Sequence, residues 1–360
     1  MGPCTYCGFC EWFGCANYSK ASPQTTILPY LVRKPNFSAR DNSEVIRINL
    51  DKSGKRATGV TFVDTDNQEW EQPADLVILS AYTMFNVHLL LHSKIGRPYD
   101  PVANTGTVGR NYTHQTTSTV NGFFDPKEYN FNPFIASGAI GMCIDEFNGD
   151  NFDHGPHGFV GGGYVGQVQT GGRPIESTLV PPGTPKWGAA WKKAAKENYL
   201  STVKPGTGVH GSFYAYRDIY LDLDPTYKDR FGRPLMRITM DLKENEIKQN
   251  KFLTDKFAEI IKAMGAEKLA IQYRKGPYDI TTYQTTHLNG GAVMGSDRST
   301  SVLNRYLQSW DVPNLFVLGA SAFPQNAGYN PTGTVGALAF WAADAIRSKY
   351  LKSPGRLVDA

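Results

Sequence analysis

The sequence predicts two fold types in one chain: α/β segments at both ends that together form one domain, and a mostly antiparallel α+β domain inserted between them. Three observations support this. A buried strand at 74–81 is followed by a helical pattern at 84–93. An apolar strand at 312–318 leads, after a loop, into a long helix at 332–350. Between about 123 and 283, glycine, proline and aromatic residues dominate, and short strands are expected.

The remaining elements follow from local patterns. Residues 1–26 are rich in cysteine, aromatic and small residues, which indicates a loop wrapped around a ligand. Polar and apolar residues alternate over 44–50 and 57–64 on either side of the turn 51–55, which predicts a β-hairpin. Residues 106–115 are expected to form a loop.

Within the middle segment, the strand candidates are 158–169, 210–223 and 235–241. One clear helix covers 244–264 and is closed by Gly265, because glycine readily adopts the conformation that ends a helix. These patterns predict an antiparallel sheet with helices.

The composition is that of a folded protein with a large core. Hydrophobic residues make up 41% and aromatic residues 12% of the 360 residues, which excludes disorder. A net charge of +4 argues against a nucleic-acid binder that depends on bulk charge. The apolar runs are far shorter than the ~20 residues of a membrane span, and residues 1–14 lack a secretory signal pattern. A missing signal does not establish the compartment, because a partner subunit can carry the export signal.

Four of the five cysteines, Cys4, Cys7, Cys10 and Cys15, lie within the first fifteen residues. Their spacing is too tight for a disulfide framework, and zinc usually takes two separated pairs of ligands. Closely spaced thiolates on one loop favour an iron–sulfur cluster, with zinc or a reactive thiol cluster as the alternatives. The neighbouring aromatic side chains would form a dry shell around the cluster: Tyr6, Phe9, Trp12 and Phe13.

Near the carboxyl end, His287 lies in the glycine-rich turn 286–295, and Asn330 precedes Pro331, Thr332 and Gly333 at a helix start. A neutral imidazole can accept the proton of a hydroxyl group while an amide orients it. The positive end of the helix suits a ligand that becomes anionic. The residues alone favour the simpler interpretation, in which His287 is a hydrogen-bonded turn residue and Asn330 is a cap.

Three groups of segments resemble the glucose–methanol–choline (GMC) oxidoreductase family in order and spacing. They are 74–81 with Leu89 to Leu91 and Gly96; Val108 to Asn111 with His114; and His287 to Gly295 followed by 314–321 and Asn330 to Thr332. Combined with the cysteine loop, they resemble the flavoprotein subunits of gluconate 2-dehydrogenase and of the FAD-dependent glucose and fructose dehydrogenases.

The resemblance implies an FAD enzyme that oxidises a CH–OH group of a sugar or sugar acid. His287 would be the catalytic base and Asn330 its partner at the flavin. Gly319 and Ala320 would lie near the FAD pyrophosphate, and Asn330 to Gly333 near the flavin, with Thr332 and Gly333 at its pyrimidine edge. Hydride would pass to flavin N5, and electrons would leave through the iron–sulfur cluster.

The resemblance also implies a cytochrome c subunit and a small subunit as partners. It further implies that the protein is located in the periplasm, or on the periplasmic side of the inner membrane, through its association with those subunits. The alternative location is the cytoplasm. We expect a 3Fe-4S rather than a 4Fe-4S cluster, although the residues do not decide between a form that uses four cysteines and one that leaves one over.

The expected domains are therefore an iron–sulfur loop at 1–26, an FAD-binding domain at 27–122 and 284–360, and a substrate domain at 123–283. The family opens with a strand, a Gly-x-Gly-x-x-Gly turn and a helix, and this chain begins at the cysteine loop instead. The pattern at 161–166 has no helical sequence after it and is interpreted as a decoy.

The sequence therefore predicts an incomplete FAD-binding domain in an amino-terminally truncated chain. A non-catalytic electron-transfer or interaction module, or a non-functional remnant, is the alternative. Other histidines have simpler interpretations. The pair His88 and His92 favours packing over zinc binding, His154 with His157 favours a surface loop over a substrate contact, and His114 is expected to be structural.

Overall fold

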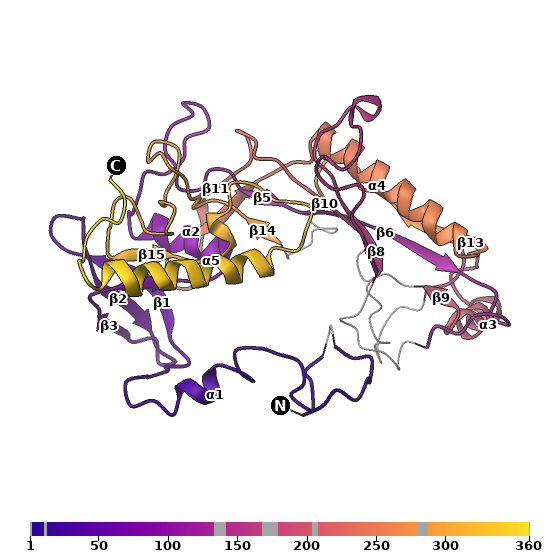
Figure 1. The fold of residues 1–360 in the computed structure, drawn as a ribbon, viewed down its shortest axis with the longest axis horizontal. Helices are drawn as coiled ribbons and strands as arrows, with labels where there is room; N and C mark the ends of the chain where they lie inside the picture. The colour runs from indigo at the N-terminus through magenta and orange to yellow at the C-terminus, as the bar shows by residue number, and fades with distance from the viewer. Residues whose placement is uncertain are drawn as a thin grey trace. The chain divides into compact units, whose positions relative to one another are not determined.

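The structure is a computed structural model that describes residues 2–10, 13–132, 142–167, 179–203, 208–279 and 287–359. Trp12 of the expected aromatic shell lies outside these residues. The chain forms two compact units (Figure 1). Unit 1 comprises Met1–Ala39, Thr116–Ser212 and Lys243–Lys275, and unit 2 comprises Arg40–Gln115, Phe213–Leu242 and Gly276–Ala360.

Unit 2 contains the elements expected at the two ends of the chain and a hairpin from the middle. Its strands are β1 (Glu44–Leu50), β2 (Ala57–Val63), β3 (Glu69–Pro73), β4 (Val77–Leu79), β5 (Thr113–His114), β11 (Tyr220–Lys228), β12 (Pro234–Thr239), β14 (Leu288–Asn289) and β15 (Leu315–Val317). Its helical segments are α2 (Thr83–His92), the 3-10 turn η3 (Ala320–Ala322), α5 (Thr332–Ala345) and the π-helical turn η4 (Ile346–Tyr350).

The predicted hairpin is confirmed as β1 and β2, which β3 extends to an antiparallel sheet of three strands. Asp51 organises the turn, because its carboxylate accepts hydrogen bonds from the Ser53 hydroxyl and from the Lys55 backbone N–H at 3.1 Å. These bonds, that of Ser53 above all, lower the pKa of Asp51.

The predicted α/β part is confirmed as a parallel pair, β4 and β15, in which Leu315 pairs with Val77. Both strands are shorter than expected. Asn314 connects the pair to the hairpin: its amide donates to the carbonyls of Ala57 at 2.7 Å and Asp75 at 2.9 Å. The buried amide group thereby holds the end of β15 in place.

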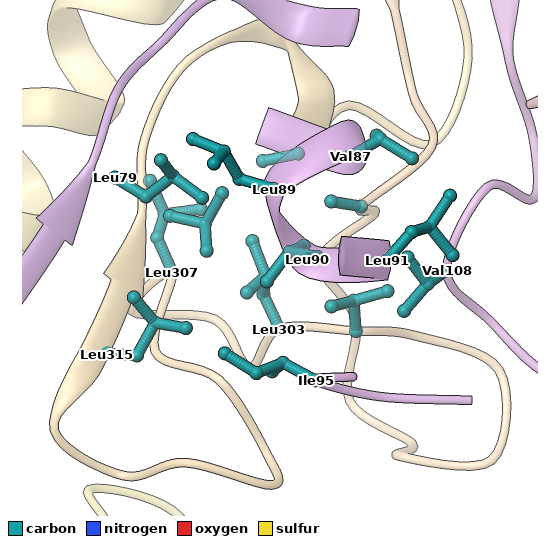
Figure 2. Packing of buried hydrophobic residues seen from close by; sticks show 14 of the residues in the cluster. Leu79, Val87, Leu89, Leu90, Leu91, Ile95, Val108, Leu303, Leu307 and Leu315 are labelled. Carbon is teal, nitrogen blue, oxygen red and sulfur yellow. The ribbon is translucent and has the colours of Figure 1, made fainter. Parts of the chain in front are cut away.

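The core of unit 2 forms around α2 (Figure 2). This helix is apolar on nearly every side, so it packs on several elements at once. Its leucines lie among the side chains of β4, β15 and the loop before β15, namely Leu79, Leu303, Leu307 and Leu315. Burying each such side chain contributes roughly 1.5–3 kcal/mol, so α2 is the central element of this unit.

Unit 1 confirms the expectation of antiparallel sheet with helices. Its elements are α1 (Leu28–Leu31), β6 (Thr116–Phe123), β7 (Met142–Ile144), the 3-10 turn η1 (Gly155–His157), β8 (Gly163–Gln167), α3 (Ala189–Asn198), β9 (Thr202–Val203), β10 (Val209–Gly211), α4 (Glu244–Ala263) and β13 (Lys268–Gln272). The sheet has the order β13-β6-β10-β8-β7, with β9 also paired to β6. One apolar face of α4 covers it, through Leu253, Phe257 and Ile261.

Two elements differ from the sequence prediction. Strand β5 lies within the loop expected at 106–115. The strand expected at 210–223 is two strands in different units: β10 pairs with β6 and β8 in unit 1, and β11 pairs with β12 in unit 2. Leu221 of β11 is fully buried in the core around α2, and its backbone N–H donates to Gly109 O at 2.8 Å. Residues 213–242 therefore belong to unit 2 and not with the rest of the middle segment. Among the described residues, no helix is long and apolar enough to cross a membrane.

Candidate active site and cysteine loop

His287 immediately precedes β14 and is half-buried. Its Nδ1 atom is hydrogen-bonded to Oε1 of Gln115, a fully buried residue that follows β5. An amide oxygen only accepts, so Nδ1 carries the proton and Nε2 is the ring nitrogen with the lone pair. Burial lowers the pKa of His287, which favours the neutral ring at neutral pH. The ring is thus prepared to accept a proton at Nε2.

The backbone at His287 is also held from several sides. It has a φ of +61°, and its carbonyl accepts a 2.7 Å hydrogen bond from the Asn326 side chain. The next carbonyl, that of Leu288, accepts from the Thr83 hydroxyl at 2.7 Å. These contacts come from distant parts of unit 2, so the position of the imidazole is set by tertiary structure.

The glycines after β14 allow the three segments of the family resemblance to meet. A Cβ on Gly290 would lie 1.8 Å from the Asn111 carbonyl oxygen, so only glycine fits there. The Gly290 N–H donates to Ala320 O at 3.0 Å, and Gly109 N–H donates to Gly291 O at 2.7 Å. The segments around Gly109, His287 and Ala320 therefore lie side by side in unit 2.

Gly319 and Ala320 lie at the carboxyl end of β15, where open α/β sheets bind ligands. Gly319 has a φ of +108°, yet the nearest atom to a Cβ placed there is Asn86 Nδ2 at 3.8 Å. No neighbouring group in unit 2 crowds this glycine, in contrast to Gly290. Its surroundings leave space for a ligand, which fits the role proposed for it near FAD.

Asn86 is a buried position near the candidate site that the sequence did not predict. It is fully buried on α2; its Oδ1 accepts from Ala81 N–H at 2.7 Å, and its Nδ2 donates to Leu318 O at 2.8 Å. It thereby joins the carboxyl ends of β4 and β15. A polar residue inside the apolar run 84–91 was the available signal. Gln115 and Asn326, which hold His287, were also missed, and neither has a comparable signal in the sequence.

Asn330, Thr332 and Gly333 are exposed at the start of α5, and Pro331 precedes the first helical residue. No side-chain hydrogen bond caps this helix, and no atom lies within 4 Å of a Cβ placed on Gly333. The backbone N–H groups of the first turn have no partner within an α-helix, so this end suits an anionic or polar ligand. The role of Asn330 beside His287 stays a prediction.

Helix α5 is apolar, yet only Ala342 and Ala345 of its fourteen residues are buried. Phe340 is 82% exposed and Trp341 is half-exposed. A helix that is apolar on all sides is normally buried, so this surface is unusual for an isolated unit.

The four clustered cysteines line one pocket of about 700 Å3 in unit 1, together with Phe9 and Phe13. None of them is in a disulfide. The prediction that aromatic side chains form a dry shell around the cysteines is wrong in part, because Tyr6 is 58% exposed and Phe13 is 37% exposed. In residues 2–10, 13–132 and the other described ranges, no three cysteine, histidine or acidic side chains are arranged to hold a metal ion.

Cys15 differs from the other three. Backbone N–H groups, that of Lys20 above all and then those of Asn17 and Ser19, hydrogen-bond to its sulfur and lower its pKa. Such N–H groups stabilise a thiolate, which is the form that binds iron. The loop therefore favours the thiolate at Cys15, and the other three cysteines line the same pocket.

The Gly-x-Gly-x-x-Gly pattern at 161–166 belongs to β8 and the residues just before it, and β8 lies in the antiparallel sheet of unit 1. A Cβ on Gly163 would lie 1.9 Å from His210 O, and one on Gly166 would lie 2.5 Å from Met142 O. These glycines allow neighbouring strands to approach closely, so the pattern is structural and the decoy interpretation is supported.

Comparison with known proteins identifies the family. The models of the GMC oxidoreductase family match residues 218–339 and 1–117. Over 363 aligned residues, the chain is 52% identical to the gluconate 2-dehydrogenase flavoprotein of Pantoea cypripedii, an alignment that covers 100% of this chain and 58% of that protein. The chain belongs to the GMC oxidoreductase family. The resemblance inferred from the sequence is confirmed.

More distant members of the GMC family align as well. The large subunit of fructose dehydrogenase from Gluconobacter japonicus is 27% identical over 81% of this chain and 50% of its own length. The 2-methyl-1,2-propanediol dehydrogenase of Mycolicibacterium austroafricanum is 29% identical over 83% of this chain and 52% of its own length. The chain thus spans little more than half the length of these curated relatives.

Solved structures share the GMC fold. Pyridoxine 4-oxidase from Mesorbium loti has a TM-score of 0.53 at 15% identity, over 85% of this chain and 57% of that one. Formate oxidase from Aspergillus oryzae has a TM-score of 0.58 at 16% identity, over 86% of this chain and 60% of that one. These likenesses confirm the fold class.

Proposed function

We propose that this GMC chain forms the hydroxyl-activating part of an FAD-dependent dehydrogenase that acts on a CH–OH group of a sugar or sugar acid. The observation that carries the proposal is the His287–Gln115 hydrogen bond, because it orients a neutral imidazole whose Nε2 can accept a proton. The similarity to a gluconate 2-dehydrogenase flavoprotein and to a fructose dehydrogenase subunit supports a polyhydroxylated substrate.

The residues present fit the flavin end of FAD. Gly319, expected with Ala320 near the FAD pyrophosphate, is uncrowded at the carboxyl end of β15, and the uncapped start of α5 offers backbone N–H groups at Thr332 and Gly333 to the flavin. Bound FAD would supply the acceptor for the hydrogen on the substrate carbon. His287 Nε2 would take the hydroxyl proton, and the Asn330 amide would orient the same oxygen. Gln115 would keep the proton of the ring on Nδ1 throughout.

The cysteine loop fits an iron–sulfur cluster by the chemistry of its donors. Four sulfurs line one pocket, and backbone N–H groups favour the thiolate of Cys15. The ligand set is not preformed among the described residues, so we propose that the loop closes around the cluster as it binds, as metal sites commonly do. We propose the 3Fe-4S form over 4Fe-4S.

Electrons would then leave to a partner. A cytochrome c subunit and a small subunit are the proposed partners, supported by relatives that are named as a flavoprotein and as a large subunit. Through those subunits the protein would reach the periplasm or the periplasmic side of the inner membrane, with the cytoplasm as the alternative.

The test uses the protein purified without oxygen. Electron paramagnetic resonance distinguishes the two cluster types, since an oxidised 3Fe-4S cluster is paramagnetic and an oxidised 4Fe-4S cluster of the ferredoxin type is silent until reduced. Flavin absorbance and dye-linked oxidation of gluconate, glucose and fructose are measured on the same sample. Flavin binding with oxidation lost in His287→Ala supports the proposal; full activity in that variant overturns it.

The exposed apolar surface of α5 favours a second candidate function, an electron-transfer or interaction module without catalysis. In that case the same sample shows the iron signal with no flavin absorbance and no substrate oxidation.

A further inference from the structure

A group of three electron-rich atoms lies between α2 and β12, apart from the residues assigned to catalysis. Nε2 of His88 and Nε2 of His92 are 2.8 Å apart. The carbonyl oxygen of Pro234 lies 2.9 Å from the first of them and 3.1 Å from the second. The three atoms therefore form a nearly equilateral triangle.

Hydrogen bonds alone do not satisfy this triangle when both rings are neutral. If both Nε2 atoms carried protons, the two N–H groups would point into each other across 2.8 Å. At most one of them carries a proton, which can be donated to the other ring or shared with the carbonyl. One proton is then shared among three electron-rich atoms, whereas a cation placed above the triangle would bind all three donors at once.

The dimensions match a metal ion. Donors held about 2.1 Å from one ion at the 90° angles of a six-coordinate site lie about 3 Å apart, closer together than in a tetrahedral site. The two histidines are four residues apart on one helix, so both rings lie on one face of α2. Imidazole nitrogens with one carbonyl oxygen suit borderline ions such as Zn2+, Co2+ or Ni2+. We propose that His88, His92 and the Pro234 carbonyl bind a divalent ion of this class.

The surroundings allow a cation to bind. Arg233, which precedes Pro234 in the chain, is paired with Asp229 at 2.8 Å and with Glu44 at 3.5 Å. His88 is buried, whereas His92 is only half-buried. The site is therefore reached from the side of His92, where water completes the coordination.

The ion would act as a structural cross-link. It would join β12 to α2, the helix that also carries Thr83 and Asn86. Those two side chains hold the carbonyls of Leu288 and Leu318, at the strand ends on which His287 and Gly319 are positioned. No carboxylate neighbours the first histidine on the helix as in hydrolytic zinc enzymes, so the ion has no assigned catalytic role.

The test is a titration of the full chain with Co2+, followed by visible absorption and by thermal unfolding. Cysteine-bound Co2+ shows thiolate charge-transfer bands, whereas a histidine and oxygen site shows only the weaker d–d bands. In the wild type we expect one equivalent of Co2+ to bind at the histidine and oxygen site and to show only d–d bands. We also expect the Tm to rise with Co2+ or Zn2+. In His92→Gln we expect at least tenfold weaker binding of that equivalent and a smaller rise in Tm than in the wild type, because the cysteines still bind Co2+ and retain the thiolate bands.

His154→Gln is the matched control, because His154 lies in unit 1 and contacts the Gly149 carbonyl rather than a second imidazole nitrogen. It should bind Co2+ like the wild type. His92 is half-buried, so its variant is expected to fold, which circular dichroism of the metal-free protein checks. Equal d–d bands in the wild type and in His92→Gln, or no such band in the wild type, would overturn the proposal.

Discussion

The imidazole of His287 is hydrogen-bonded through Nδ1 to the amide oxygen of Gln115, a residue 172 positions earlier in the chain. The two residues meet because β14 pairs with β5, so that Leu288 lies opposite His114. The pairing of two strands of only two residues each thus determines which ring nitrogen of the proposed base contacts Gln115.

Gln115→Glu is expected to keep the ring orientation and to shift the pH profile. A carboxylate at this position still accepts from Nδ1–H, but its charge raises the pKa of His287 by stabilising the imidazolium. The acidic limb of kcat/KM for dye-linked oxidation should move to higher pH. Gln115→Leu should instead lower kcat by roughly tenfold or more, because the ring loses its orienting partner. An unchanged profile in Gln115→Glu would show that the contact does not tune the base.

The pH dependence of the parent protein follows from the burial of His287. Burial holds the folded-state pKa below the ordinary value of about 6.5. The neutral ring, and with it kcat/KM, should persist below pH 6.5 and fall only as the pH drops through the lowered pKa. The contribution of His287 to stability is fully present above about pH 6.5 and declines as the pH falls toward that pKa, because the unfolded chain takes up the proton first. His287→Ala should remove this part of the pH dependence of unfolding.

Cys15 should be alkylated at lower pH than an ordinary thiol in the cluster-free protein. Its backbone N–H partners, Lys20 foremost, favour the thiolate, which is the reactive form. Iodoacetamide labelling across a pH series, read by peptide mass spectrometry, measures this directly. Cys143, which lies outside the cysteine loop, is the internal reference. Labelling of both residues with the same pH midpoint would contradict the prediction.

Asn86→Ala should destabilise unit 2 by about 2–4 kcal/mol, because it leaves several buried polar groups at the ends of β4 and β15 without their partner. The measurement is the free energy of unfolding by urea. Gln72→Ala, an exposed position on β3, serves as the control and should change stability by less than about 0.5 kcal/mol. Similar small effects in both variants would mean that the Asn86 bonds are not important to the unit.

Phe340→Glu should make the chain more soluble at little cost in stability. The ring is 82% exposed on α5, so the substitution removes apolar surface without leaving a cavity. We expect weaker fluorescence of a bound apolar dye and less aggregation in light scattering, with an unfolding free energy within about 0.5 kcal/mol of the parent. A large loss of stability would show that Phe340 is buried in solution.

Local patterns predicted much of the fold. The hairpin, α2 and α4 were expected within a residue or two, because turn residues, apolar periodicity and a closing glycine are local signals. Strands were less certain: β4 and β15 are shorter than expected, and the strand expected at 210–223 divides between the two units. Strand limits depend on the partner strand, which lies far away in the sequence.

The residues of the candidate site were likewise only partly predictable from the sequence. His287, the glycines around it, Gly319 with Ala320, and the start of α5 could be identified from the sequence, because their residue types and order resemble a family that the comparisons confirm. Gln115, Asn86 and Asn326 could not. Glutamine and asparagine are common on any surface, and what distinguishes these three is that they are buried with hydrogen-bond partners from distant segments.

The sequence by itself determined the family, the mixed fold class, the clustered cysteines and the proposed base, because each can be inferred from residue types at fixed spacings. Only the tertiary structure decided which nitrogen of His287 can take a proton, that Cys15 is the thiolate-prone cysteine, and that His88 and His92 converge on the carbonyl of Pro234. The first and the third depend on atoms brought together by long-range packing, whereas the backbone N–H groups that act on Cys15 belong to its own loop, at Asn17, Ser19 and Lys20. Residue spacing along the chain does not specify such contacts, because burial and directional hydrogen bonds select them only once the core has formed.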